Sequence, residues 1–126
     1  MATKTAIASA NMLHKIHIDS GKEVIQTIKE YCKKNNIKNA AIVSLIGALD
    51  KGRVMSSSKS DAMENIYANF EESLELSGTG EIVDGTPHIH CILGRVDGKI
   101  IMGHLEQGFV KAWFVNAYLL PLKKHK

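Results

Sequence analysis

The chain has 126 residues, of which 44% are hydrophobic, and its formal net charge at pH 7 is +3. This length is typical of one domain and is enough to bury a sizeable core. No stretch approaches the roughly 18 apolar residues that a membrane-spanning helix needs, which excludes an integral membrane protein of the helical class.

We expect a single domain over residues 1–126, with a core from about 13 to 120 and a basic tail over 121–126. The sequence has no linker rich in Pro, Gly or Ser and no internal repeat. Its first residues lack the apolar segment of a secretory signal, and its two cysteines have neither metal-binding nor redox spacing. We therefore interpret Cys32 and Cys91 as buried, reduced thiols and the protein as cytoplasmic.

The positive charge is carried by 14 Lys and only two Arg, Arg53 and Arg95. Nucleic-acid-binding domains usually gather basic side chains on one face, and arginine is their usual reader of guanine. Here the lysines are spread along the chain, apart from a run at 123–126. The charge therefore gives only weak support for DNA as a partner.

The first regular elements are a strand and a helix. Residues 12–18 alternate between apolar and polar side chains, which predicts a strand. Ser20 and Glu23 have the spacing of a capping box, so a helix is expected to begin there. An apolar stripe at helical spacing continues it to about 33–36, where lysines suit the negative end of the helix dipole.

The rest of the chain is predicted to form strands joined by turns. The strands are expected at 40–49, 54–55, 66–77, 87–96, 99–105 and 109–120. Gly47 indicates a bulge or a close backbone contact, a turn is expected at 51–52, and glycines at 78, 80 and 108 should interrupt the strands. The expected fold is α/β in the broad sense and α+β in type: a mainly antiparallel sheet of about six to seven strands with one long helix packed on it.

The strongest chemical signal is a histidine-bearing hairpin. His88 and His90 lie two residues apart on a predicted strand, so both side chains point to the same face. His104 lies on the returning strand. A two-residue turn at Asp97 and Gly98 would place His104 opposite Cys91, on the wrong face.

A three-residue turn changes the register of this hairpin by one residue. Val96, Asp97 and Gly98, with Gly98 left-handed in a bulge, would pair Arg95 with Lys99. His104 would then lie opposite His90, where directly opposed Cβ atoms are roughly 4.5–5.5 Å apart. The hypothesis of three converging imidazoles therefore depends on the turn.

Three neutral imidazoles with an open fourth position suit Zn²⁺, and other divalent metals are alternatives. In the competing interpretation, these histidines are ordinary strand residues, hydrogen-bonded or half exposed. Glu106 is the acid that follows His104, and it could be a fourth ligand, a general base, a second layer around the metal or a solvated carboxylate. The sequence names no catalytic residue.

Three segments resemble the plants and prokaryotes conserved (PPC) domain family. Residues 70–78, FEESLELSG, resemble its F-E-[I/L]-L-S-L-S-G strand, and residues 46–49, IGAL, resemble its [I/V]-G-[S/A]-[L/V] strand end. Residues 87–94, PHIHCILG, followed by Asp97-Gly98 and then Gly103-His104-Leu105, resemble the hallmark hairpin P-H-x-H-x-x-[L/V]-[G/S]…D-G…G-H-[L/V]. The resemblance covers about residues 13–120.

The resemblance implies a fold, an assembly and a site. Members have an antiparallel sheet flanked by helix and are typically homotrimers; prokaryotic ones are single-domain and often described as a "putative DNA-binding protein". Several hold a metal, taken as zinc, on the histidines that match His88, His90 and His104. Plant members add an Arg-Gly-Arg-Pro element that reads the DNA minor groove, and this sequence has no such element.

Four hypotheses follow. The first is a homotrimeric zinc-binding protein with water or a small ligand in the open position. The second is a DNA-associated regulator that tolerates many sequences, supported by the charge and the lysine tail. The third is a metal-dependent enzyme of unknown substrate, and the fourth is an assembly module. Phe109, Trp113 and Phe114 suit a subunit interface as well as a core.

Overall fold

A computed structural model describes residues 6–8 and 13–124, which form nine strands and one helix. The elements are β1 (Ala6–Ala8), β2 (His14–Ile18), α1 (Val24–Lys34), β3 (Ala40–Leu49), β4 (Lys51–Ser57), β5 (Asn65–Phe70), β6 (Leu74–Val83), β7 (Thr86–Gly94), β8 (Ile100–Phe109) and β9 (Val115–Lys124). The predicted class is confirmed, a mainly antiparallel sheet with one helix, although the strands number more than six or seven. Within these residues, no helix has the length and hydropathy to cross a membrane.

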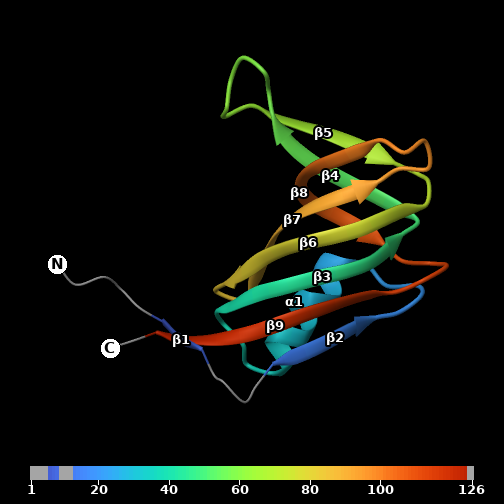
Figure 1. Cartoon of the computed structure of the whole chain (residues 1–126). Coiled ribbons are helices and arrows are strands. Elements are labelled where there is room, and N and C mark those ends of the chain that lie inside the picture. The colour runs from blue at the N-terminus through green and yellow to red at the C-terminus, as the bar shows by residue number, and fades with distance from the viewer. Residues whose placement is uncertain (1–5, 9–12, 125–126) are drawn as a thin grey trace.

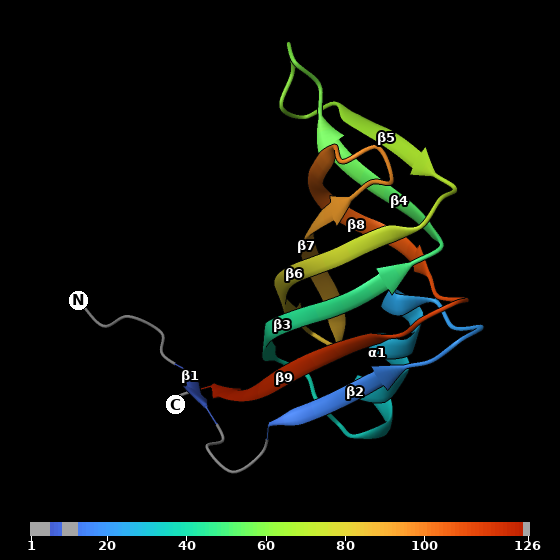
Figure 2. The ribbon, with the colours of Figure 1, turned by 45° about the vertical axis from the view of Figure 1, so that its right-hand side comes forward.

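All nine strands belong to one sheet, in the order β1-β9-β3-β6-β7-β8-β4-β5, with β2 also paired to β9. The views of Figures 1 and 2 agree that β9 lies between β2 and β3, although it is the last strand in sequence. The β4–β5 pair extends from the opposite end of the sheet (Figure 1). The histidine-bearing strands β7 and β8 are therefore internal, with paired strands on both sides.

Helix α1 begins three residues later than the capping-box prediction. Glu23, and not Ser20, is the N-cap residue, and its carboxylate accepts hydrogen bonds from the backbone N–H groups of Ile25 and Gln26. The same carboxylate accepts a bond from the backbone N–H of Gly108 on β8, at 2.8 Å. This distant donor ties the start of the helix to the sheet and explains why Glu23 acts as the cap. The helix ends at Lys34, as expected.

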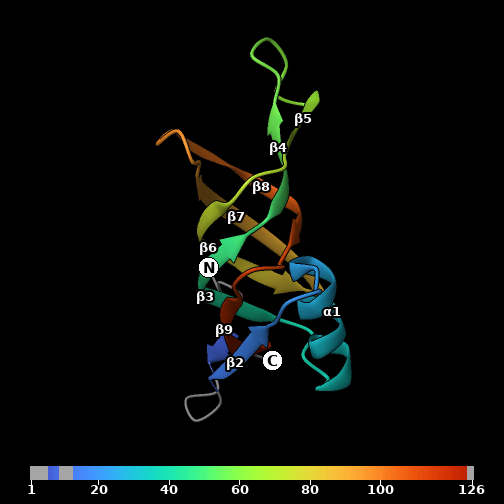
Figure 3. The ribbon, with the colours of Figure 1, turned by 90° about the vertical axis from the view of Figure 1, so that its right-hand side faces the viewer.

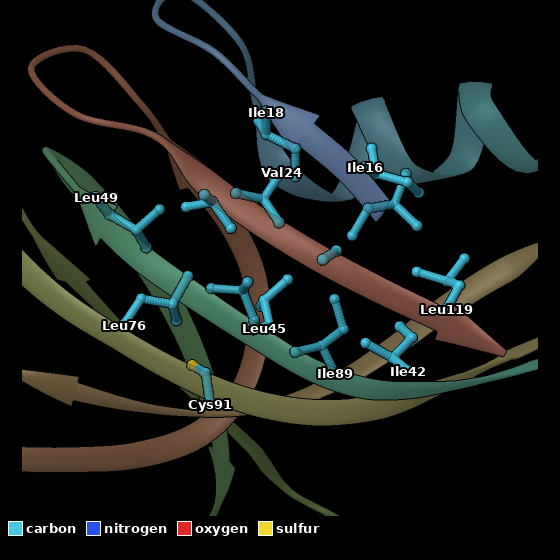
Figure 4. Close-up of a cluster of buried hydrophobic side chains, with 14 of the residues drawn as sticks. Ile16, Ile18, Val24, Ile42, Leu45, Leu49, Leu76, Ile89, Cys91 and Leu119 are labelled. Carbon is cyan, nitrogen blue, oxygen red and sulfur yellow. The ribbon is translucent and has the colours of Figure 1, made fainter. Parts of the chain in front are cut away.

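The core lies between α1 and one face of the sheet, which Figure 3 shows edge-on. On β7, Ile89, Cys91 and Leu93 are fully buried, whereas the residues between them are exposed. The buried set includes Val24, Ile42, Leu45 and Leu119 from other elements (Figure 4). Because side chains alternate along a strand, His88 and His90 face away from the helix, on the uncovered side of the sheet.

Several predicted boundaries are wrong, because contacts distant in sequence extend the strands. Gly78 and Gly80 lie inside β6, and Gly108 lies inside β8. The turn expected at 51–52 is the start of β4, which pairs with β8. Gly47 does make the close backbone contact: a Cβ there would lie 2.1 Å from the carbonyl oxygen of Phe114.

Both ends of the last strand also differ from the sequence expectation. Strand β9 begins at Val115, so Trp113 lies before the strand. Trp113 is 63% exposed. At the other end, β9 continues through Lys124 because β1 pairs with residues 122–124. The basic tail expected from residue 121 is therefore part of the sheet as far as 124, and 125–126 lie outside the described residues.

Candidate metal centre

The β7–β8 turn has the three-residue form. The backbone N–H of Gly98 donates to the carbonyl of Arg95 at 2.9 Å, and that of Arg95 donates to the carbonyl of Lys99 at 2.8 Å. Gly98 has φ +83°, which glycine adopts without the steric cost of a Cβ. Asp97 supports the turn by accepting a bond from the backbone N–H of Lys99. The register that follows pairs His90 with His104, as the three-residue turn predicts.

The three predicted histidines converge on the uncovered face of the sheet. Each of His88, His90 and His104 offers a ring nitrogen, and these three atoms all lie within 4.8 Å of one another. The ring centroids are 5.0, 5.1 and 6.4 Å apart. Within 6–8 and 13–124, this is the one group of three or more His, Cys, Asp or Glu that meets this geometry.

The donor set fits a late divalent metal such as zinc. Zn–N distances are about 2.0–2.1 Å, so two nitrogen ligands of a tetrahedral zinc lie about 3.3 Å apart. The separations of up to 4.8 Å therefore have to shrink by at most about 1.5 Å, within reach of small side-chain rotations. His88 and His90 are exposed and His104 is half-buried, so the rings have room for that adjustment.

The electrostatics around His104 favour its neutral form. Burial lowers the pKa of His104, the neighbouring His88 lowers it further, and Glu106 opposes both effects. A neutral imidazole is the form that binds a metal. The Glu106 carboxylate lies 3.7 Å from Nε2 of His104 and is 41% exposed. Glu106 is thus beside the triad, beyond direct hydrogen-bonding distance of His104 and more exposed than His104.

Glu72 is a supporting residue that the sequence did not reveal. Its carboxylate accepts bonds from Nε and Nη2 of Arg95 and from the backbone N–H of Val96. The Arg95 guanidinium also lies over the ring of Phe70, 5.0 Å from its centroid. Glu72 therefore binds both Val96, the first residue of the turn, and Arg95, the residue before it. The one sequence feature that points to Glu72 is the family-like segment that begins at Phe70, because it contains both Phe70 and Glu72.

Glycines bring the neighbouring strands close to the histidine backbone. A Cβ at Gly80 would lie 2.2 Å from the carbonyl oxygen of His88, and one at Gly78 would lie 2.8 Å from that of His90. On the other side, a Cβ at Gly103 would lie 3.0 Å from the carbonyl oxygen of Met55. Gly78 and Gly80, which were predicted to break a strand, instead permit tight packing of β6 on β7, and Gly103 permits it on the β4 side of the hairpin.

Two further histidines, His14 and His17, and both cysteines lie outside the triad. His14 Nδ1 lies 2.6 Å from the hydroxyl of Tyr31, and His17 Nδ1 lies 2.7 Å from Oδ1 of Asn116. Both cysteines are free and buried, and burial raises the pKa of Cys91 to about 11.

Comparison with known protein families confirms the family resemblance of the sequence. The model of the Plants and Prokaryotes Conserved (PCC) domain, also written PPC, matches residues 6–120. The chain belongs to this family. No match was found among curated proteins.

Solved structures extend the PPC comparison. A plant- and prokaryote-conserved protein from Pyrococcus horikoshii is 29% identical, with a TM-score of 0.84 over 100% of this chain and 87% of that one. A metal-containing protein from Archaeoglobus fulgidus is 25% identical, with a TM-score of 0.84 over 99% and 88%. A protein from Bacteroides thetaiotaomicron described as a "putative DNA binding protein" is 19% identical, with a TM-score of 0.74 over 94% and 82%. The last shows a shared fold alone.

Proposed function

We propose that this PPC-domain protein binds a divalent metal, preferentially Zn²⁺, through His88, His90 and His104. The observation that carries the proposal is the convergence of three ring nitrogens within 4.8 Å on paired strands. The metal-containing relative from Archaeoglobus fulgidus, similar over almost the whole chain, adds support. Three imidazoles leave a fourth position of zinc free for water or a small ligand.

In this proposal, the protein fixes the histidines and the metal supplies the chemistry. A zinc ion with an open position can polarise a bound oxygen atom or lower the pKa of a bound water. Glu106, whose carboxylate lies 3.7 Å from Nε2 of His104, acts as an outer partner of the site. Asp97, through its side-chain Oδ1, and Gly98 and Gly103, through their backbone, set the register and spacing of the hairpin.

Calorimetric titration with Zn²⁺ tests the proposal. Wild-type protein should bind one zinc per chain, and H88A, H90A and H104A should each weaken binding by more than the roughly 10- to 100-fold typical of losing an outer partner. H17A is the matched control, since His17 is an exposed strand histidine outside the site. Equal zinc affinity in H90A and H17A would contradict the proposal.

We also propose that the chain assembles as a homotrimer. An apolar stripe, formed by Ile92, Ile100 and Met102, continues from the triad along the uncovered face of β7 and β8. These residues are 44%, 72% and 65% exposed, and contiguous exposed apolar side chains commonly mark interfaces. Burial of this stripe against other copies would remove it from water.

Light scattering coupled to size exclusion tests the assembly. The proposal gives a particle of three times the 13.8 kDa chain mass. M102E should reduce that mass, because a charge in an apolar interface is costly to desolvate. M63E is the control, since Met63 is 88% exposed in the β4–β5 loop. A monomeric wild type would contradict the trimer.

DNA is the alternative partner. It is suggested by the name "putative DNA binding protein" of the Bacteroides thetaiotaomicron neighbour and by the net charge of +3. Electrostatic binding to DNA weakens steeply as salt rises, because the protein displaces counterions from the phosphates. Titration of duplex DNA across a salt series distinguishes the alternatives: a steep negative slope supports DNA, and no binding at low salt removes it.

A further inference from the structure

A groove of about 560 Å³ opens beside the histidine triad, on the side of β6. It is lined by the ends of four strands that meet there, β3, β6, β7 and β9, which lie together at one edge of the molecule in Figure 1. Both His88 and His90 line this groove. Its volume falls within the roughly 300–1,000 Å³ of small-molecule sites.

The groove wall carries one carboxylate next to the triad. Glu81 on β6 is the Cα partner of His88, and Thr79 is the partner of His90. Directly opposed side chains have Cβ atoms roughly 4.5–5.5 Å apart. Glu81 is exposed and belongs to the groove lining, so its carboxylate is available to accept a hydrogen bond from a molecule held there.

The remainder of the groove is mainly apolar. Ala41 is the Cα partner of Glu81 on its other side, and Leu122 and Val83 add aliphatic surface. Val83 is 50% exposed, which leaves its side chain free to contact a ligand. Along this groove, therefore, a metal site, a hydrogen-bond acceptor and an aliphatic surface follow one another.

We infer that this groove binds a small aliphatic carboxylic acid that carries a hydroxyl or ammonium group beside its carboxylate. The inference rests on the proposed metal site. A divalent metal on three neutral imidazoles has a net charge of +2 and attracts an anionic oxygen donor. Glu81 accepts the hydrogen bond of the adjacent hydroxyl or ammonium, and the aliphatic tail lies against Ala41, Val83 and Leu122.

Three matched probes test the inference: 3-methylbutanoate, 2-hydroxy-3-methylbutanoate and valine. They share an aliphatic tail and a carboxylate, and only the last two carry the adjacent donor. Protein loaded with Co²⁺ provides a visible absorption spectrum that responds to a change of metal ligand. The hydroxy acid or valine should shift this spectrum at a concentration at least about tenfold lower than 3-methylbutanoate.

Three variants locate the effect. E81L, which removes the acceptor, should abolish the preference for the donor-bearing acids, whereas E75L should retain it. Glu75 is an exposed glutamate on the same strand and face, six residues away, or about 20 Å along a strand. A41L should fill the groove and weaken all three probes while Co²⁺ uptake stays unchanged.

The outcomes separate the inference from the metal proposal. Absence of a Co²⁺ spectrum would overturn both. Normal Co²⁺ uptake with equal responses to the three probes, or with a preference that survives in E81L, would overturn the groove inference alone. If A41L leaves every probe unaffected, the ligand binds outside the groove and the inference is wrong.

Discussion

The carboxylate of Glu72 accepts two hydrogen bonds from the guanidinium of Arg95, at 3.1 Å from Nε and 2.8 Å from Nη2, although 23 residues separate them in sequence. Bidentate pairs of this kind fix orientation as well as distance. Arg95 is the residue before the turn whose length determines whether His104 lies opposite His90. The pair therefore couples the segment before β6 to the geometry of the candidate metal centre.

Loss of this pair should weaken metal binding without removing a ligand. E72Q loses the charge of the bidentate partner and should reduce zinc affinity on the order of tenfold, as other supporting residues of metal sites do. E71Q is the control, because Glu71 forms a much more exposed pair with Lys51. Calorimetric titration measures both variants, and equal affinity in the two would show that the turn does not depend on Glu72.

The same pair predicts a dependence of stability on acid pH. The bond to Arg95 is the main cause that lowers the pKa of Glu72 in the folded protein. A carboxylate whose folded pKa is lowered stabilises the fold above its unfolded pKa, and this contribution is lost as pH falls through the folded pKa. Urea unfolding should show wild type to be more stable than E72Q at pH 6, with the difference disappearing below the folded pKa. If wild type and E72Q differed in stability by the same amount at every pH, the ion pair of Glu72 with Arg95 would not be the cause of the difference.

Gly80 should be intolerant of any side chain. A Cβ there would lie 2.2 Å from the carbonyl oxygen of His88, so the backbone that carries a candidate ligand would have to move. G80A should lower the free energy of unfolding by about 1–3 kcal/mol, the usual cost of overpacking, and should weaken zinc binding. G94A is the control, since a Cβ at Gly94 would lie 3.4 Å from the Cβ of Glu75, which is an ordinary van der Waals contact. Equal stability of G80A and G94A would contradict the close packing of β6 on β7.

Cys91 should be chemically inert in the folded protein. Its side chain is fully buried, and burial raises its pKa to about 11, so roughly one molecule in a thousand is a thiolate at pH 8. Cys32 is also fully buried, and burial raises its pKa. A thiol reagent such as iodoacetamide should label neither residue in native protein and both after denaturation, as mass spectrometry would show. Rapid native labelling of Cys91 would mean that the core opens readily.

The histidine cluster was predictable because it depends on local rules. Alternation along a strand places His88 and His90 on one face, and the turn at Val96–Gly98 determines the partner of His104. All of this information lies within 17 consecutive residues, 88–104. The alternatives differed only in turn length, and the structure has the three-residue form.

The parts that were mispredicted depend on contacts distant in sequence. Gly78 and Gly80 have the composition of a turn, but their lack of a side chain lets β6 pack against the backbone of β7. Glu23 has the position of a third helical residue, but its bond to the N–H of Gly108 makes it the cap. The proximity of Glu81 to His88 depends on the pairing of β6 with β7, which the local sequence pattern does not reveal.

The account depends most on whether His88, His90 and His104 bind one metal ion together. The most direct measurement is an anomalous difference map, collected at the zinc absorption edge from crystals of zinc-loaded protein. The account predicts a single strong peak per chain, about 2.0–2.1 Å from one ring nitrogen of each histidine. Crystals grown with zinc that show no peak there, or a peak on other side chains alone, would contradict it.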